Sequence, residues 1–107
     1  MECIFCKIIN KEIPTNIVFE DDDVIAFNDI NPISPVHILV IPKRHIGSVV
    51  DIKSEDSDLM GKLIFTAKKL ADDFGISQKG YKLLIRVGKD GGQEVQHIHL
   101  HLIGGKK

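Results

Sequence analysis

Apolar and polar residues alternate most regularly near the C-terminal end of the sequence, over residues 95–103. A period of two predicts a β-strand with one buried face. Side chains two positions apart share a face of a strand, so His97, His99 and His101 should line one face. The opposite face is aliphatic from Ile98 onward and belongs in a core. Three of the chain's five histidines therefore form one row.

Four further segments have the apolar content and the flanking turn residues of strands. A turn of three acids separates the first two segments, and a loop with two prolines separates the second from the third. These strands are expected over residues 17–20, 24–28, 37–41 and 81–87.

Two segments instead follow the 3.6-residue period of an amphipathic helix, residues 4–10 and 54–74. Ser54 is expected to cap the longer helix, and Gly75 is expected to end it. Gly61 inside that helix costs about 1 kcal/mol relative to alanine, which suggests close packing at this position.

The whole pattern predicts one α+β domain over residues 1–107, with about five antiparallel strands, one short helix and one long helix. The 107 residues are 43% apolar and 27% charged, which are values typical of a globular protein. A net charge of −1 provides no basic surface for nucleic acid or for an anionic membrane. Neither a signal peptide nor an apolar run of about 20 residues is present, so a cytoplasmic protein is expected.

Three interpretations of the histidine row compete. A solvated strand face is disfavoured, because imidazole is a poor choice for an inert surface. A metal site is limited by geometry, since neighbours on one face are about 6.6 Å apart and Zn–N bonds are about 2.0–2.1 Å long. Two neighbours can converge on one ion, but three cannot easily do so. Catalysis is favoured, because a neutral imidazole is a nucleophile near pH 7 and a second imidazole can hold or pass its proton.

The two cysteines form a Cys3-x-x-Cys6 motif. A disulfide is disfavoured in a reducing cytoplasm, and a thioredoxin-like pair requires a preceding strand that is absent. Half of a zinc site is the third interpretation, and it requires two more ligands. The motif alone does not decide between them.

Other polar positions are also open to two interpretations. His37, taken singly, is a strand-edge residue with its ring in water, and His45 is a loop residue. The glycine-rich loop of residues 88–93 directly precedes the histidine row. It is either a plain hairpin turn or a loop whose backbone N–H groups approach an anion.

The segment from His97 to Ile103 reads His-φ-His-φ-His-φ-φ, where φ is apolar. This pattern resembles the signature of the histidine triad (HIT) superfamily of nucleotide hydrolases and transferases. The resemblance runs nearly end to end and favours the Hint-like branch over the Fhit-like dinucleotide hydrolases. It also rests on Ile4-Phe5, residues 7–9, Lys11 to Pro14, Ala26-Phe27, Asp29-Ile30, residues 37–46, Lys79 to Tyr81, residues 90–93 and Gly104-Gly105.

The resemblance implies a purine nucleoside phosphoramidase, which cleaves the P–N bond of adenosine 5′-monophosphoramidates and releases AMP. It implies a HIT-like fold whose five-stranded antiparallel sheet pairs into a ten-stranded sheet in a homodimer, through the long helix and the fourth strand. It implies neither a catalytic metal nor an organic cofactor. The alternatives are a dinucleoside polyphosphate hydrolase and a non-catalytic module that binds nucleotide or zinc.

The resemblance also implies roles for single residues. His99 would attack the α-phosphorus and carry the nucleotidyl group, while a backbone carbonyl fixes its other ring nitrogen. His101 and His37 would bond to each other and support proton movement to the leaving amine. His97 would orient the others.

The implied nucleotide site surrounds this triad. Asp29 would bind the ribose hydroxyls beside the Ile30 backbone. Backbone N–H groups around Gly92, Gln93 and Glu94 would hold phosphate oxygens. The base would lie against apolar side chains, namely Ile4, Phe5, Ile8, Phe27 and also Leu39.

Some bacterial-type members of the superfamily carry a Cys-x-x-Cys near the start and bind zinc with two histidines. The matching positions here are Cys3, Cys6, His45 and His97, a closed Cys₂His₂ set. One structural zinc per chain is therefore implied, which would pin the N-terminal helix to the triad strand and leave His99 free.

Two residues depart from the Hint pattern, which usually has Asn at the place of Arg86 and often Ser at the place of Glu94. Arg86 would either donate to a phosphate or point away and pair with Glu94. An ionised Glu94 would repel a phosphate, whereas a protonated one would serve as an acid for the leaving group. The sequence stops at Lys107, so a short C-terminal segment is also expected.

Overall fold

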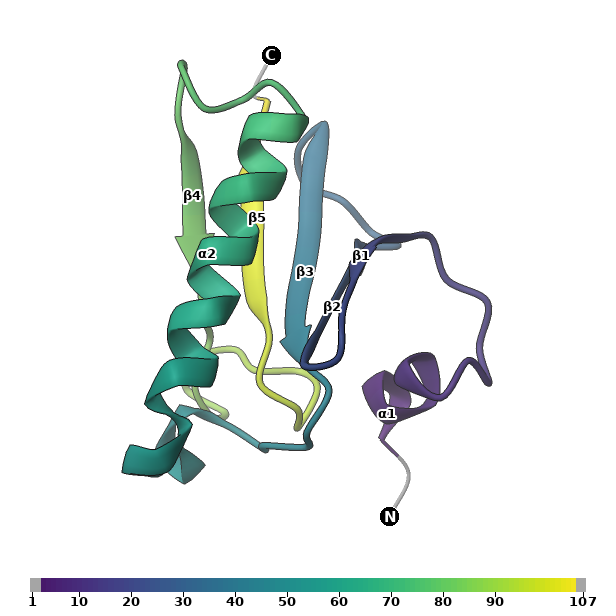
Figure 1. Ribbon diagram of the computed structural model, residues 1–107, viewed down its shortest axis with the longest axis vertical. Coiled ribbons are helices and arrows are strands. Elements are labelled where there is room, and N and C mark those ends of the chain that lie inside the picture. The colour runs from purple at the N-terminus through teal and green to yellow at the C-terminus, as the bar shows by residue number, and fades with distance from the viewer. Residues whose placement is uncertain (1–2, 106–107) are drawn as a thin grey trace.

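The computed structural model describes residues 3–105 (Figure 1). The domain predicted over residues 1–107, and the expectation about a segment ending at Lys107, extend beyond the described residues. The elements, in chain order, are α1 (Ile4–Ile9), β1 (Ile17–Glu20), β2 (Val24–Asn28), β3 (Val36–Pro42), short 3-10 turns at Val49–Asp51 and Ser54–Asp56, α2 (Ser57–Asp73), β4 (Tyr81–Leu84) and β5 (Leu100–Gly104).

The predicted α+β fold is confirmed. The five strands form one antiparallel sheet in the order β1-β2-β3-β5-β4. The last strand therefore inserts between β3 and β4, so that β5 is an interior strand although it comes last in the chain. This order puts residues that are 62 positions apart in sequence side by side, because Leu39 of β3 pairs with His101 of β5.

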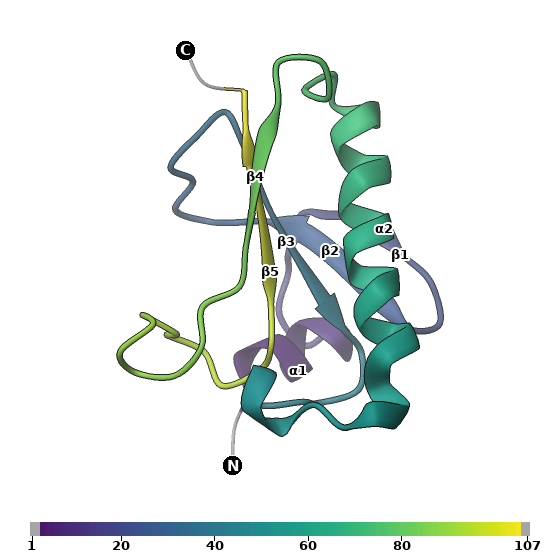
Figure 2. The same cartoon turned by 90° about the vertical axis from the view of Figure 1, so that its left-hand side faces the viewer.

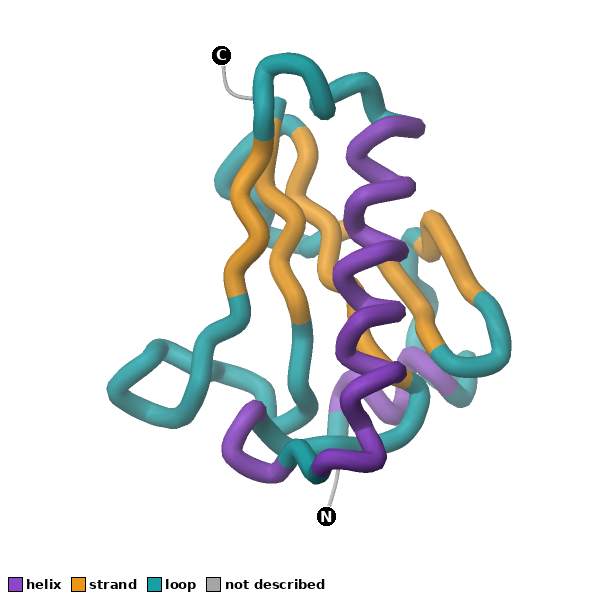
Figure 3. The backbone as a smooth tube through the Cα atoms, turned by 60° about the vertical axis from the view of Figure 1, so that its left-hand side comes forward, coloured by secondary structure: helices purple, strands orange, loops and turns teal. Residues whose placement is uncertain are grey.

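The two helices cover opposite faces of the sheet. Helix α2 lies along one face, as Figures 2 and 3 show, and buries Leu63, Ala67 and Leu70 against aliphatic side chains of β2, β3 and β5. Helix α1 is the smaller cover, and its Phe5 and Ile8 pack against apolar residues of β2 and β3 that alternate with the first set. The face that carries the histidines is the one α1 covers only in part.

The ends of α2 differ in how well the sequence predicted them. Gly75 has φ of 73° and follows the last turn, so the predicted stop at this glycine is confirmed. The predicted Ser54 cap is wrong, because the α-helix begins at Ser57. The Asp56 carboxylate, which is buried, instead accepts from the Lys53 backbone N–H at 2.9 Å and pairs with Arg44.

Two strands are shorter than predicted, and one packing inference is wrong. Strand β4 ends at Leu84 rather than at residue 87, and β5 begins at Leu100 rather than at residue 95. Between them the backbone leaves the sheet ladder, and the N–H of Ile98 donates to the carbonyl of Ile46 at 2.7 Å.

Gly61 has open space around the position that a Cβ would take, so close packing within the chain does not explain this glycine. Among the described residues, no helix is long and apolar enough to cross a bilayer.

Candidate active site and the neighbouring cysteine–histidine cluster

The three triad histidines lie at the point where the chain enters β5. His101 is on the strand, whereas His97 and His99 precede it on irregular backbone. The rings of His99 and His101 still meet, with centroids 5.0 Å apart. Two members of the predicted row therefore lie together in space, although only His101 belongs to a regular strand.

The protonation pattern of His99 follows from one contact. Its Nδ1 lies 2.8 Å from the backbone carbonyl oxygen of His97. A carbonyl oxygen only accepts, so Nδ1 must carry the proton, and in the neutral ring Nε2 keeps its lone pair. The ring edge of Phe5 also packs against His99, with centroids 5.1 Å apart and planes at 86°. His99 is thus held in the tautomer that a nucleophilic imidazole requires.

A second chain of contacts runs from His101 to Asp29. The backbone N–H of Ile33 donates to His37 Nδ1 at 3.2 Å, so the proton of the neutral His37 ring is on Nε2. That nitrogen lies 3.0 Å from His101 Nδ1 and 3.4 Å from an Asp29 carboxylate oxygen. His37 is buried, so the expectation that its ring lies in water is wrong.

The same series of hydrogen bonds determines that Nε2 of His101 carries the ring proton. Its Nδ1 accepts from His37, so its proton is on Nε2, and that atom is buried with no hydrogen-bond partner among the described residues. Burial lowers the pKa of His101 to about 4, electrostatic contributions from His99, His37 and Arg86 act in the same direction, and Asp29 opposes them. His101 is therefore neutral at pH 7 and presents an unused N–H.

These groups face one cavity of about 420 Å³. Asp29 and His37 lie in its wall together with His99 and His101. The rest of the wall includes both residues that depart from the Hint pattern, and its remaining members are Asn31, Ile33, Arg86, Gly92, Glu94 and Ile103. The structure thus brings a nucleophile, a histidine pair and a carboxylate to one hollow.

The residues expected around a base divide into two groups. Phe5, Ile8 and Phe27 are buried in one cluster with Leu39, beside the cavity, and the rings of Phe5 and Phe27 are 5.5 Å apart. Ile4 is 50% exposed and lines a separate hollow of about 380 Å³, whose wall shares Glu94 with the cavity. The Ile30 side chain is 88% exposed.

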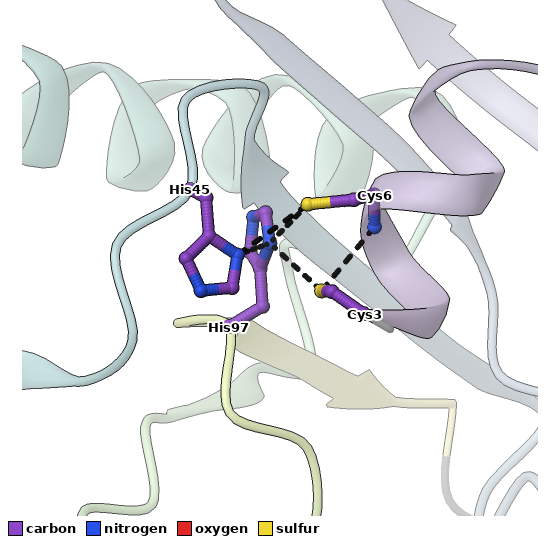
Figure 4. Close-up of side chains that lie close together, drawn as sticks. All are labelled: Cys3, Cys6, His45 and His97. Atoms are coloured by element: carbon purple, nitrogen blue, oxygen red, sulfur yellow. Dashed lines mark hydrogen bonds between the residues drawn. The ribbon is translucent and has the colours of Figure 1, made fainter. Parts of the chain in front are cut away.

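A second cluster gathers four potential metal ligands (Figure 4). Cys3 and Cys6 come from the start of α1, His45 from the loop after β3, and His97 from the segment before β5. Their two Sγ and two Nδ1 atoms all lie within 4.8 Å of one another. All four residues that the family resemblance implies as metal ligands lie together, so this cluster can bind a metal ion.

The tautomer of His97 suits that role. Its Nε2 lies 2.8 Å from the Pro42 carbonyl oxygen and must donate to it, which leaves a lone pair on the Nδ1 that faces the cysteines. Burial is the main cause that lowers the pKa of His97, so the ring is neutral at pH 7. Its backbone carbonyl meanwhile holds His99. His97 therefore joins the two clusters through different atoms.

The family model for the HIT domain matches residues 10–107. The chain belongs to the HIT family. The purine nucleoside phosphoramidase of Escherichia coli K12 is 49% identical over 105 residues, which cover 98% of this chain and 88% of that protein. An uncharacterized HIT-like protein of Buchnera aphidicola is 45% identical over 97% of this chain and 93% of its own length.

Solved structures of HIT proteins agree with this fold throughout. A HIT family hydrolase from Legionella pneumophila superimposes with a TM-score of 0.97 at 50% identity, over 99% of this chain and 95% of that one. A histidine triad protein from Clostridium difficile gives 0.96 at 48% identity, over 100% and 93%.

One polar residue of this HIT chain has a role that the sequence did not reveal. The side-chain amide of Gln93 is buried, accepts from the Gly88 N–H at 3.0 Å, and donates to the carbonyls of Gly47 and Val95 at 2.7 and 2.9 Å. It ties the glycine-rich loop to the segment that follows His45. A lone glutamine in such a loop gives no sequence signal for this, because its partners are backbone atoms and one of them, the carbonyl of Gly47, lies 46 residues away.

The loop also uses some of its own donors. The N–H groups of Gly92 and Gln93, both expected to hold phosphate oxygens, donate to the carbonyls of Lys89 and Gly88 at 3.0 Å. Both bonds close the turn. Of the three N–H groups expected at the phosphate, the one on Glu94 has no such bond among the described residues.

Proposed function

We propose that this chain is a hydrolase that cleaves the P–N bond of purine nucleoside 5′-monophosphoramidates and releases AMP or its purine analogue. The observation that carries the proposal is the fixed tautomer of His99, which leaves Nε2 unprotonated in a residue that lines the cavity. The near-full-length identity to a protein named purine nucleoside phosphoramidase supports the same activity.

The proposed reaction has two displacements. His99 Nε2 attacks the α-phosphorus, a new N–P bond forms, and the bond to the leaving nitrogen breaks as that nitrogen takes a proton. The His101–His37–Asp29 chain supports the proton transfer, because the bound phosphate anion raises the proton affinity of the neighbouring imidazoles. Water then attacks phosphorus, the N–P bond to His99 breaks, and the water proton returns to the hydrogen-bonded series His101–His37–Asp29.

Substrate position follows from the same wall. The Asp29 carboxylate would accept from ribose hydroxyls, with Ile30 beside it, and its distance of 3.4 Å to His37 would couple ribose binding to the proton chain. Phe5, Ile8, Phe27 and the exposed Ile4 would face the base. The N–H of Glu94 is the best placed of the loop donors for a phosphate oxygen, because those of Gly92 and Gln93 are used in the turn.

A comparison of substrates tests the activity. Adenosine 5′-phosphoromorpholidate and AMP linked to the amine of lysine should each release AMP, followed by chromatography. Diadenosine polyphosphates should be cleaved at least about a hundredfold more slowly in kcat/KM, a difference of roughly 2.7 kcal/mol in transition-state stabilisation. Faster cleavage of the dinucleotides would instead identify a dinucleoside polyphosphate hydrolase, and binding without any cleavage would identify a non-catalytic module.

We also propose that the cysteine–histidine cluster holds one structural zinc ion. Tetrahedral zinc with bonds of about 2.3 Å to sulfur and about 2.05 Å to nitrogen places S and N ligands about 3.5 Å apart and two N ligands about 3.3 Å apart. Three of the four S···N separations are 3.5, 3.4 and 3.7 Å, and the two Nδ1 atoms are 3.2 Å apart. This donor set fits the ion and leaves no open position, so zinc would stabilise the fold and take no part in the hydrolysis.

The Gln93 side chain offers a test of how the loop serves the site. Gln93→Ala leaves the N–H of Gly88 and the carbonyls of Gly47 and Val95 without partners, which should lower the free energy of unfolding by about 1–3 kcal/mol. Because the loop then positions phosphate poorly, kcat/KM should fall by about tenfold or more. Gln96→Ala, an exposed glutamine nearby, is the control. Equal effects of the two substitutions would contradict the role given to Gln93.

A homodimer is the proposed assembly. Strand β4 is an edge of the sheet, with Leu83 37% exposed, and α2 exposes Ile64 at 54% and Phe65 at 65%. An open edge beside exposed apolar side chains favours pairing with a second copy. Sedimentation at micromolar concentration should give a dimer, and Phe65→Asp should shift it to monomer, whereas Ile33→Asp, equally exposed but outside α2 and β4, should not. A monomeric unmodified protein would contradict the proposal.

A further inference from the structure

Arg86 is a charged residue of the cavity wall that the proposed hydrolysis does not use. The chain has two arginines, and the other one, Arg44, pairs with the buried Asp56. Within residues 3–105 no carboxylate lies within 4.0 Å of the Arg86 guanidinium. The guanidinium lies over the glycine-rich loop instead, with Nη1 3.4 Å from the position that a Cβ would take on Gly92.

The register of the sheet places Arg86 at one end of the cavity. Leu84 of β4 pairs with His101 of β5, and Arg86 follows two residues later, beyond the end of the strand, where it lines the cavity with His99 and His101. Asp29 lies at the other end, because its N–H bonds to the carbonyl of His37 on β3. The histidines therefore separate a carboxylate end from a guanidinium end of the same hollow.

Under the proposed function, the nucleoside occupies the Asp29 end and the phosphorus sits at His99. The remaining end, lined by Arg86, Gly92 and Glu94, is left for the part of the substrate that departs. An unpaired guanidinium presents a planar fork of donors that matches a carboxylate or a phosphate.

We propose that Arg86 is a specificity-determining residue, which selects substrates whose leaving group carries a negative charge of its own. This inference rests on the proposed function. The charged group is either a carboxylate, as in an amino acid joined to AMP through its nitrogen, or a phosphate, as in a dinucleoside polyphosphate. Both present oxygen pairs to the same fork of N–H donors.

Glu94 lines the same end and opposes this selection. Its side chain is exposed, and it forms the boundary between the cavity and the hollow beside Cys3 and His45. Its negative charge repels an anionic leaving group, so its removal should act in the opposite direction to removal of Arg86. Removal of Arg86 should therefore weaken the selection for an anionic leaving group, and removal of Glu94 should strengthen it.

The experiment compares AMP joined to glycine with AMP joined to glycine methyl ester, which differ by one charge at the leaving group. The readout is the ratio of kcat/KM for the acid to kcat/KM for the ester. Arg86→Gln should lower this ratio by about five- to tenfold, as expected for loss of a partly exposed charged hydrogen bond. Arg86→Lys should retain part of it, and Glu94→Gln should raise it. Diadenosine triphosphate has a leaving group that carries phosphate, and its kcat/KM is compared with that of the ester in the same way.

Lys89→Gln is the matched control, because Lys89 is an exposed cation of the same loop that does not line the cavity. It should change the ratio by less than about twofold, since exposed charges at a distance are screened by salt. A loss confined to the glycine substrate identifies a carboxylate and a loss confined to the triphosphate identifies a phosphate, and either supports the proposal. If Arg86→Gln leaves kcat/KM for the glycine acid and for the triphosphate both unchanged relative to the ester, or if Lys89→Gln lowers either of them equally, the proposal is overturned. Cleavage of neither AMP conjugate by the unmodified protein would instead refute the proposed function.

Discussion

Replacing His99 with alanine should abolish turnover, with a fall in kcat of at least about a thousandfold, as expected when a covalent nucleophile is removed. Nucleotide binding should persist, because Asp29 and the apolar cluster around Phe5 and Phe27 remain in place. Single-turnover release of AMP measures the first quantity, and calorimetric titration with AMP measures the second. Together the two measurements separate loss of chemistry from loss of the site.

A trapped intermediate makes the same test more direct. Acid-free quenching of the protein with substrate should leave a nucleotidyl adduct on the peptide that contains His99, identified by mass spectrometry. His37→Ala removes a member of the proton chain but not the nucleophile, so it should slow turnover and still yield the adduct. Retention of more than about one-hundredth of the activity by His99→Ala, or an adduct on another residue, would exclude this histidine as the nucleophile.

Cys3→Ser should remove the zinc ion and most of the stability that it provides. If free zinc exceeds its dissociation constant by about a thousandfold, linkage predicts a loss of about 4 kcal/mol, or roughly 15 °C in the unfolding midpoint. Serine is the most specific substitution for this test, because Cys3 is also the N-cap of α1 and its Sγ accepts from the Cys6 N–H. A serine hydroxyl keeps that cap while it removes the thiolate.

The control is a chelator. EDTA should lower the unfolding midpoint of the unmodified protein toward that of Cys3→Ser and should have no further effect on the variant. Metal analysis should give one zinc per chain for protein purified without added metal. A content below about one-tenth zinc per chain, or a chelator effect that survives in Cys3→Ser, would refute the structural zinc.

Much of the fold was accessible from the sequence because its patterns are local. Alternation and helical periodicity located every strand and both helices, and Gly75 marked the end of α2 correctly. The residues of the functional site could also be predicted, but for a different reason. His37 and Cys3 meet partners more than sixty residues away, and only the resemblance to a known family linked them in advance.

The remainder depends on tertiary contacts that no local pattern encodes. The buried Asp56, held by Arg44, shifts the start of α2 past Ser54. The Gln93 amide holds the loop in part through the backbone carbonyl of the distant Gly47. His37 was expected in water from its place at a strand end, and it is buried because the loop after Asp29 folds back and donates the Ile33 N–H to its ring.

The departure of the chain from regular strand geometry before Leu100 has a consequence for protein engineering. In an ordinary antiparallel ladder the carbonyl at His97 would bond to a neighbouring strand, whereas here it is free to accept the Nδ1 proton of His99. Grafting the alternating histidine motif onto a well-formed strand of another scaffold would therefore reproduce the spacing of the rings without selecting their tautomer. A designer who wants this chemistry must copy the irregular backbone along with the side chains.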